Sequence, residues 1–171
     1  MSSRHPPTDF RLDAFLPYRI SVLASRVSRR FGRVYGSRFD LSIPEWRLIA
    51  HLAQSGAVSV REIFDKVDMD KPKVSRAARR LEDAGLIDKR TDTGDRRLVQ
   101  LSLTVDGERL FREIEPLAKA FEASLLADLT DDEVRVFERV IDRLMRRLDE
   151  TDDTDIAAPE RPLAVPALSG D

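Results

Sequence analysis

The stretch DMDKPKVSRAARRLEDAGLIDKR, residues 68–90, decides the fold of this chain. Apolar residues recur in it at steps of three and four, which predicts an amphipathic helix over about residues 71–84. Asp70 is a plausible N-cap and Gly85 is a natural C-terminal stop for that helix. The side chains expected to point inward are Val74, Ala77, Ala78 and Leu81.

The opposite face of this helix is strongly basic, and the acids within the helix come only after Leu81. Arginine can read guanine with two hydrogen bonds, whereas Lys and Ser mostly hold phosphate. The helix N-terminus adds backbone N–H groups and a positive dipole end, which favour an anion. The alternative is a solvated face of an ordinary helix, because a run of charges is not specific by itself. The candidate DNA contacts are Lys71, Lys73, Ser75, Arg76, Arg79 and Arg80.

The flanking segments turn this helix into a winged helix-turn-helix. A capping box at Ser59–Glu62 starts a short helix over about 60–67, and only DMD separates the two helices, as in a helix-turn-helix. Two segments with strand character follow, LIDKR at 86–90 and LVQLSL at 98–103, and they predict a two-stranded hairpin with a charged tip. An isolated hairpin is marginally stable, so it must pack against the helices before it.

The tip of this hairpin, TGDRR, supplies a second set of candidate contacts. Asp95 and Arg97 lie two residues apart on one side of an extended strand, where the carboxylate can hold the guanidinium in one pose. A narrow minor groove attracts such an arginine. The alternative is a surface turn with an ion pair that contributes little. The candidate contacts at the tip are Asp95, Arg96 and Arg97.

Longer helices surround this core, so the expected fold class is mainly α with a small β-hairpin wing. Capping boxes at Ser42–Glu45 and Thr130–Glu133 start two of these helices, Thr104 is a plausible cap for another, and Pro116 predicts a bend. The N-terminal residues and the acidic, Pro- and Ala-rich tail are expected to be disordered. The helices are expected at about 13–35, 43–54, 105–127 and 131–149, and the disordered ends at 1–11 and 150–171.

The composition excludes several classes of function. The 171 residues contain no cysteine, which rules out disulfides, Cys-containing zinc sites and a thiol redox sensor. Two isolated histidines, no phosphate-binding Gly loop and no nucleophile elbow argue against an enzyme, a metal site and a cofactor. Neither a membrane span nor a signal peptide is visible, so a cytoplasmic protein without a membrane partner is expected. The formal net charge of −2 hides a basic region, because residues 70–97 hold nine Lys and Arg against six Asp and Glu.

The chain resembles the MarR family of winged-helix transcriptional regulators. The resemblance is carried by MDKPKVSRAARRLEDAGLIDKRTDTGDRRLVQLSLTVDGERL, residues 69–110, and by LSIPEWRLIAHLA, residues 41–53, and it covers about residues 12–149. It implies a DNA-binding core over about 42–104, which binds a pseudo-palindromic double-stranded operator, usually as a repressor. It also implies a homodimer joined by helices at about 12–36 and 105–149. Pro72 departs from the family pattern, since many relatives have a small residue there.

The apolar stripes of the last two helices agree with such a dimer, because they are too far in sequence from the wing to be covered by it. A twofold pair would place two recognition helices about one DNA turn apart. These stripes contain Leu117, Phe121, Leu125, Val136, Val140 and Leu144.

MarR-like regulators often release DNA when a small molecule binds, and the sequence gives weaker signals for such a ligand. Arg19, Arg26 and Arg33 recur every seven residues on a helix that is nearly free of acids, which would suit an anion such as an aromatic carboxylate or an acyl-CoA. A solvated face is the alternative for these arginines. Trp46 and His51 are further ligand candidates, with a core position as the alternative for Trp46. The competing function is an architectural winged-helix protein that binds DNA without an effector.

Overall fold

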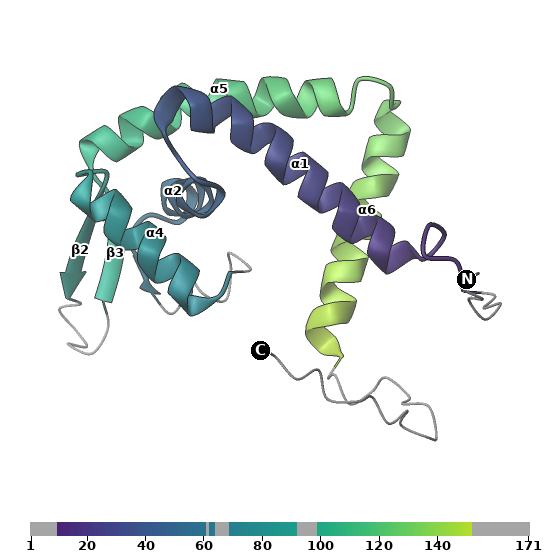
Figure 1. The fold of residues 1–171 in the computed structure, drawn as a ribbon, viewed down its shortest axis with the longest axis horizontal. Coiled ribbons are helices and arrows are strands. Elements are labelled where there is room, and N and C mark those ends of the chain that lie inside the picture. The colour runs from purple at the N-terminus through teal and green to yellow at the C-terminus, as the bar shows by residue number, and fades with distance from the viewer. Residues whose placement is uncertain (1–9, 61, 64–68, 92–98, 152–171) are drawn as a thin grey trace, which may run out of the picture. The chain divides into compact units, whose positions relative to one another are not determined.

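The computed structural model describes residues 10–60, 62–63, 69–91 and 99–151 (Figure 1). The expected helix over 60–67 falls partly outside this range, although residues 60, 62 and 63 are helical. The elements are α1 (Leu16–Phe39), α2 (Ile43–Ser55), β1 (Val58–Ser59), α4 (Lys71–Asp83), β2 (Ile87–Thr91), β3 (Val99–Leu103), α5 (Val105–Leu125) and α6 (Asp131–Glu150). None of the described helices is long and apolar enough to cross a membrane.

The chain divides into two compact units, one ending at Ser124 and one beginning at Leu125. The first unit contains the described strands β1 to β3, helices α1, α2 and α4, and α5 up to Ser124, and the second contains α6. The candidate DNA-binding residues and the ligand candidates all belong to the first unit, so that unit is described first.

Most helix boundaries agree with the sequence because capping residues fix them. The capping box at Ser42 begins α2, and Asp70 begins α4 by accepting a hydrogen bond from the backbone N–H of Lys73. Helix α4 ends in a Schellman motif, in which the N–H of Leu86 donates to the carbonyl of Leu81 and Gly85 adopts a left-handed φ of 71°.

Helix α1 differs most from its expected range of 13–35. It begins at Leu16, with Pro17 in the first turn, where a missing N–H does no harm. It then continues to Phe39. Its C-cap is Asp40, which adopts a left-handed φ of 52° although it is not a glycine. Aspartate tolerates this conformation better than most residues, which is why no glycine marks the stop.

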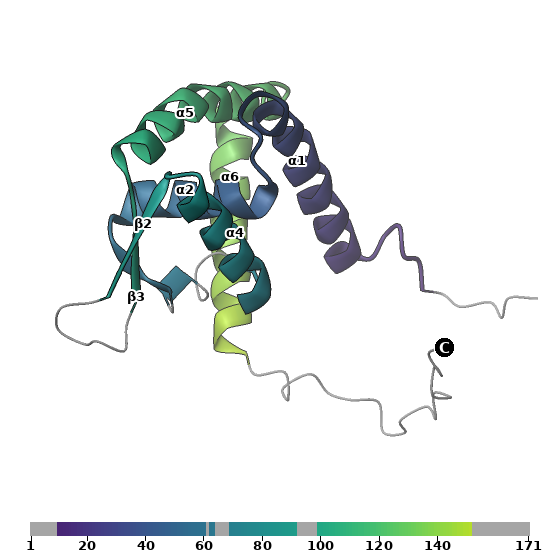
Figure 2. The same cartoon turned by 60° about the vertical axis from the view of Figure 1, so that its left-hand side comes forward.

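The sheet has three antiparallel strands in the order β1-β3-β2, so the expected hairpin is confirmed but a third strand joins it. β2 and β3 pair from Ile87↔Leu103 to Thr91↔Val99, as expected for the wing. The additional strand β1 pairs Val58 with Leu101 on the other edge of β3. A two-residue strand carries too little pattern to be seen in the sequence, but it gives the wing a third strand. Figure 2 shows β2 and β3 side by side, next to α4.

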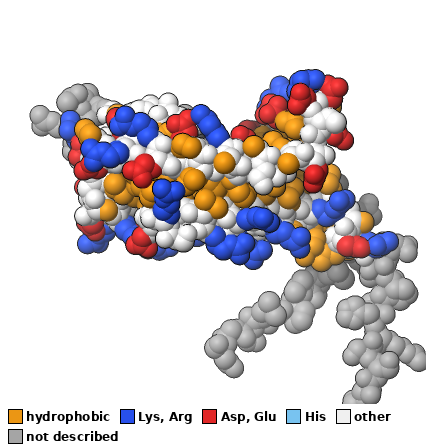
Figure 3. All heavy atoms as spheres, turned by 90° about the horizontal axis from the view of Figure 1, so that it is seen from above, with side chains coloured by type: hydrophobic (Ala, Val, Ile, Leu, Met, Phe, Trp, Pro, Cys, Tyr) orange, Lys and Arg blue, Asp and Glu red, His pale blue; other side chains and the backbone are white. Residues whose placement is uncertain are grey.

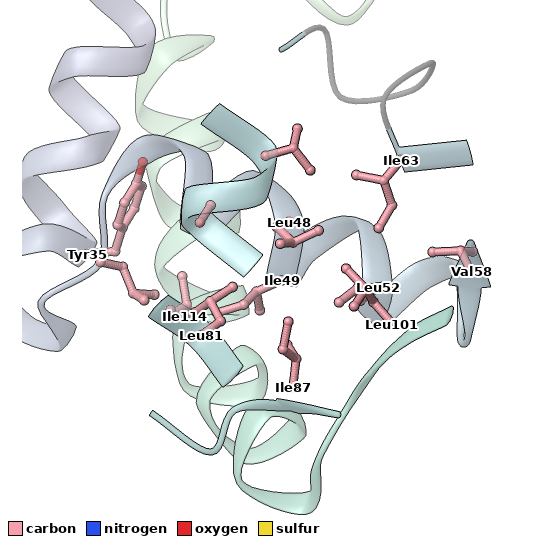
Figure 4. Close-up of a cluster of buried hydrophobic side chains, with 13 residues drawn as sticks. Tyr35, Leu48, Ile49, Leu52, Val58, Ile63, Leu81, Ile87, Leu101 and Ile114 are labelled. Atoms are coloured by element: carbon pink, nitrogen blue, oxygen red, sulfur yellow. The ribbon is translucent and has the colours of Figure 1, made fainter. Parts of the chain in front are cut away.

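The core of the first unit lies among α2, α4, the sheet and the N-terminal half of α5 (Figure 4). The inward face predicted for α4 is confirmed, because Val74, Ala77 and Leu81 are buried and Ala78 packs against the core as a partly buried residue. The other buried hydrophobic residues are Tyr35, Leu41, Leu48, Ile49, Leu52, Val58, Ile63, Ile87, Leu101 and Ile114.

A tight corner joins the base of the wing to α5. The N–H of Thr104 donates to the carbonyl of Leu86 at 3.1 Å, and its hydroxyl donates to the carbonyl of Gly85 at 2.7 Å. The same hydroxyl accepts from the N–H of Gly107 at 3.1 Å, which caps the first turn of α5. A Cβ on Gly107 would lie 2.0 Å from the carbonyl oxygen of Leu86, so only glycine fits. The end of α4, the wing and α5 therefore meet in one rigid junction.

An aromatic cluster links α1 and α2 to α5. Phe31 stacks on Phe121 with ring centroids 5.1 Å apart, and Trp46 stacks on Phe111 at 6.1 Å. Phe31 and Trp46 also meet edge to face at 5.5 Å. Phe121, which the sequence assigned to a dimer stripe, thus packs against its own chain. Burial beside these rings raises the pKa of Tyr35 to about 12.

Candidate nucleic-acid interface

The outer face of α4 carries the candidate contacts as the sequence predicted. All six of these side chains are exposed, whereas Val74, Ala77 and Leu81 of the same helix are buried. Position on the outer face is necessary for docking in a DNA groove, and it follows directly from the spacing of the inward residues. The exposed candidates are Lys71, Lys73, Ser75, Arg76, Arg79 and Arg80.

The N-terminus of α4 offers fewer free N–H groups to a phosphate than the sequence suggested. Pro72 has no N–H, and the N–H of Lys73 is taken by Asp70 at 2.8 Å. The N–H of Val74 donates to the Asp70 carbonyl as part of the helix ladder. Phosphate binding by this helix must therefore come mainly from side chains rather than from its backbone.

Lys73 is partly neutralised at the start of α4. Its ammonium lies 2.7 Å from the Asp70 carboxylate, and this contact, with the backbone N–H, holds the pKa of Asp70 below its usual value. Arg76 makes no ion pair with any residue that the structure describes, and Arg79 only approaches Asp83 at 4.0 Å. Arg76 and Arg79 are consequently the arginines of this face most available to an external anion.

Arg80 behaves differently from its neighbours. Its Nη2 donates to the Asp40 carboxylate at 2.8 Å and to the Asp40 carbonyl at 3.1 Å. Its Nε lies 3.3 Å from Oε1 of Glu45. Sequence reasoning missed these contacts, because Asp40 and Glu45 lie at least 35 residues away and no periodicity connects them to α4.

The tip of the wing lies outside the described residues, so the positions of Asp95, Arg96 and Arg97 are not given by the structure. The described strands lead toward it from Thr91 and from Val99. On β2, Arg90 pairs with Asp88 at 3.2 Å, two residues away on the same side of the strand. Arg90 is a basic residue of the wing that the sequence analysis did not select.

The ligand candidates are not brought together. Arg19 and Arg26 are exposed on α1, whereas Trp46 lies in the aromatic cluster, which agrees with its alternative reading as a core residue. His51 is partly buried, and its Nε2 has no hydrogen-bond partner in the described part of the chain. The described residues also contain no cluster of His, Asp and Glu that could hold a metal ion.

An open cleft of about 340 Å³ lies in the first unit between the end of α2, β3 and the start of α5. Leu52, Ala53 and Phe111 give it an apolar floor, while Ser102 and Arg112 are among its polar lining residues. It contains none of the predicted ligand residues. Its position, touching both the wing strand and α5, was not evident from the sequence because its lining residues are widely separated.

Both units leave apolar side chains in solvent. On α1 these include Leu16, Ile20 and Leu23. Figure 3 shows a band of hydrophobic side chains bordered by charged ones on the face that it draws. In the second unit, α6 has a strongly amphipathic sequence but buries none of its residues. Its exposed large hydrophobic residues are Val136, Phe137, Val140, Ile141, Leu144, Met145 and Leu148.

Comparison with known proteins gives consistent results. The model of the MarR family matches residues 41–99, which include α2, α4 and most of the wing. The HTH-type transcriptional repressor Rv2887 of Mycobacterium tuberculosis is 29% identical over 131 residues, which are 76% of this chain and 91% of the relative. The HTH-type transcriptional regulator YwoH of Bacillus subtilis is 30% identical over 99 residues, 58% of this chain and 72% of the relative.

Solved structures share the fold. A MarR/EmrR family transcriptional regulator from Acinetobacter sp. ADP1 has a TM-score of 0.76 and 25% identity, and the match covers 83% of this chain and all of that protein. BpsR of Bordetella bronchiseptica, whose DNA binding is regulated by 6-hydroxynicotinic acid, has a TM-score of 0.71 and 23% identity over 85% of this chain and 100% of its own. The arrangement around α4 is thus that of a known class of DNA-binding protein.

Proposed function

This chain belongs to the MarR family of DNA-binding transcriptional regulators, and on that premise we propose that it is a homodimeric repressor of a pseudo-palindromic operator. Members of this family regulate transcription and are not enzymes. The observation that carries the proposal is the outer face of α4, where exposed basic side chains stand opposite a buried apolar row.

In the proposed complex, α4 lies in the major groove and reads base edges chiefly through Arg76. Lys71, Lys73, Ser75 and Arg79 contact phosphate and set the register of the helix. The wing reaches the neighbouring minor groove, with Asp95, Arg96 and Arg97 as its contacts. The third strand, β1, supports this wing from the far edge of the sheet.

The dimer is supported by the apolar side chains that each unit leaves uncovered. An amphipathic helix gains most of its stability by burying its apolar face, and α6 buries none of it within its own chain. A second copy of the chain would cover α6 and the exposed apolar residues of α1. Twofold symmetry would then present two α4 helices to two half-sites.

The proposed effector is a small aromatic acid. BpsR, which has the same fold, responds to 6-hydroxynicotinic acid, and the cleft of about 340 Å³ in this chain combines the apolar Phe111 with the cationic Arg112. A ligand there would touch both β3 and α5, and so could shift the wing relative to the helices. Glu108, also in the lining, would have to turn away from a carboxylate.

The test of DNA recognition is a competition experiment. The full-length protein would be incubated with labelled DNA from upstream of its own gene and excess random competitor, at two salt concentrations. A repressor should keep a specific complex, whereas a phosphate-driven architectural protein should lose it to competitor and fall steeply in affinity with salt. Loss of the complex in competitor would contradict sequence-specific regulation.

The effector is tested on the same complex. Hydroxylated pyridine and benzene carboxylic acids would be titrated into the protein–DNA complex, with the corresponding uncharged amides as controls. Release by the acids and not by the amides is expected if Arg112 holds a carboxylate. Equal release by both, or release that persists in Arg112→Gln, would contradict this site.

A further inference from the structure

We infer that Arg80 is a positioning residue, which clamps α4 to the corner between α1 and α2 and does not contact DNA. This inference rests on the proposed docking of α4 on DNA. It corrects the expectation from sequence, which grouped Arg80 with the other exposed cations of the helix.

The guanidinium of Arg80 is already occupied by three contacts to two residues. Nη2 donates to the carboxylate and to the carbonyl of Asp40, at 2.8 Å and 3.1 Å, and Nε faces Oε1 of Glu45 at 3.3 Å. A guanidinium presents its donors in a rigid planar fork. Contacts through both Nε and Nη2 therefore fix the plane of the group, and with it the third turn of α4.

Glu45 gives the clamp its strength. Its side chain is only 4% exposed, whereas those of Arg80 and Asp40 are 56% and 95% exposed. The exposed pair with Asp40 contributes little, but a buried carboxylate needs partners for its charge. Oε2 of Glu45 accepts the N–H of Ser42 at 2.6 Å, and Oε1 faces Arg80. Moving Arg80 to a DNA phosphate would leave Oε1 without its cation.

The clamp connects α4 to two helices at once. Asp40 is the C-terminal cap of α1 and Glu45 belongs to the capping box of α2. In the proposed dimer, α1 contributes to the interface, so the clamp relates the recognition helix to the subunit contact. The orientation of α4, and not its charge, is what Arg80 supplies.

Arg79, the residue directly before Arg80, provides a matched comparison. It has the same charge, is 85% exposed, and approaches only Asp83 at 4.0 Å. If both arginines bound phosphate, their removal would have the same effect on the salt dependence of binding. If Arg80 only positions the helix, the two variants differ.

The experiment measures binding of full-length protein to a labelled duplex from upstream of its own gene, over a series of KCl concentrations. The variants are Arg79→Gln, Arg80→Gln, Arg80→Lys, Glu45→Gln and the double variant Arg80→Gln/Glu45→Gln. Thermal melts choose a temperature at which every variant is folded. The slope of log K against log salt is negative, and each lost phosphate contact should decrease its magnitude by about 0.9.

We expect Arg79→Gln to decrease the magnitude of this slope by about 0.9. We expect Arg80→Gln to leave the slope unchanged while weakening binding roughly 5- to 30-fold. Arg80→Lys keeps the charge but cannot bridge both carboxylates, so it should also weaken binding. Glu45→Gln should behave similarly, and the double variant should be no weaker than the worse single variant, because both changes remove one interaction.

Two results would overturn the inference. One is a slope for Arg80→Gln that falls as much as that of Arg79→Gln. The other is wild-type affinity in both Arg80→Lys and Glu45→Gln, which would make Arg80 a simple phosphate contact. An unchanged slope in Arg79→Gln would instead overturn the proposed docking of α4, and the clamp with it.

Discussion

Substitution of Gly107 by alanine should destabilise the protein severely, because the first turn of α5 lies against the backbone of the wing. The new Cβ would sit 2.0 Å from the carbonyl oxygen of Leu86, which is 1.4 Å inside the ordinary contact limit of 3.4 Å. A backbone carbonyl cannot rotate away as a side chain can. The first turn of α5 must therefore move away from Leu86.

The cost of that movement can be worked out from the corner. Overpacking of a close contact costs about 1–3 kcal/mol. Separation would also break the hydrogen bonds from Thr104 to Leu86 and to Gly85, each of about 1 kcal/mol. Alanine returns at most about 1 kcal/mol through its better helix propensity. The free energy of unfolding should therefore fall by about 2–4 kcal/mol.

The assay is urea unfolding followed by far-UV circular dichroism, at one fixed protein concentration because the proposed dimer would be stabilised by mass action. The midpoint of Gly107→Ala should fall by roughly 1 M or more. Gly36→Ala in α1 is the matched control, since its Cβ would meet only the Leu41 carbonyl oxygen, at 3.3 Å. It should change stability by less than about 1 kcal/mol. A wild-type midpoint for Gly107→Ala, or equal losses in both variants, would refute the reasoning.

Four further predictions concern DNA recognition, assembly and the pH dependence of stability. Arg76→Ala should weaken binding to the recognised duplex by about 1–3 kcal/mol in competition gel shifts, and unchanged discrimination against scrambled DNA would remove Arg76 from base reading. Leu144→Asp puts a charge in the apolar row of α6 and should give a monomer in light scattering at micromolar concentration, whereas a persistent dimer would show that this row does not pair. Because burial raises the pKa of Tyr35 to about 12, Tyr35 ionises above pH 10 in the unfolded chain but only near pH 12 in the folded chain; the free energy of unfolding should fall by about 2 kcal/mol between pH 10 and 12, and chemical denaturation of Tyr35→Phe should lack that fall. The lowered pKa of Asp70 means that its contribution to stability is complete above its usual value of 3.8 and is lost at lower pH, so the melting temperatures of wild type and Asp70→Ala should differ at pH 7 and converge toward pH 3.

The local pattern of α4 was sufficient to predict the helix, its two ends and its exposed basic face. The spacing of Val74, Ala77 and Leu81 sets which side is buried, and burial of one side leaves the basic side in solvent. Asp70 and Gly85 mark its ends because each satisfies backbone groups within a few residues. These features depend only on residues that are close along the chain, so they can be predicted from the sequence.

The features that sequence reasoning missed all depend on distant residues or on backbone already in use. Nothing near Arg80 indicates that Asp40 and Glu45 will meet it. The two-residue strand β1 exists because β3 offers it an edge. The sequence shows that Pro72 departs from the family pattern, but its effect depends on the contact of Asp70, since together they leave few N–H groups for a phosphate.

The uncovered row of α6 has a consequence for the turnover of the protein. An isolated helix of 20 residues is only marginally stable in water. The capping box at Thr130 and the ion pair between Arg135 and Asp132, three residues apart, add little to its stability. In the proposed dimer a second copy covers α6, so a newly made chain without its copy would expose α6 to proteases and assembly would protect it. The number of regulator molecules in a cell would then depend on how fast subunits find each other, and limited proteolysis at increasing protein concentration would measure that protection directly.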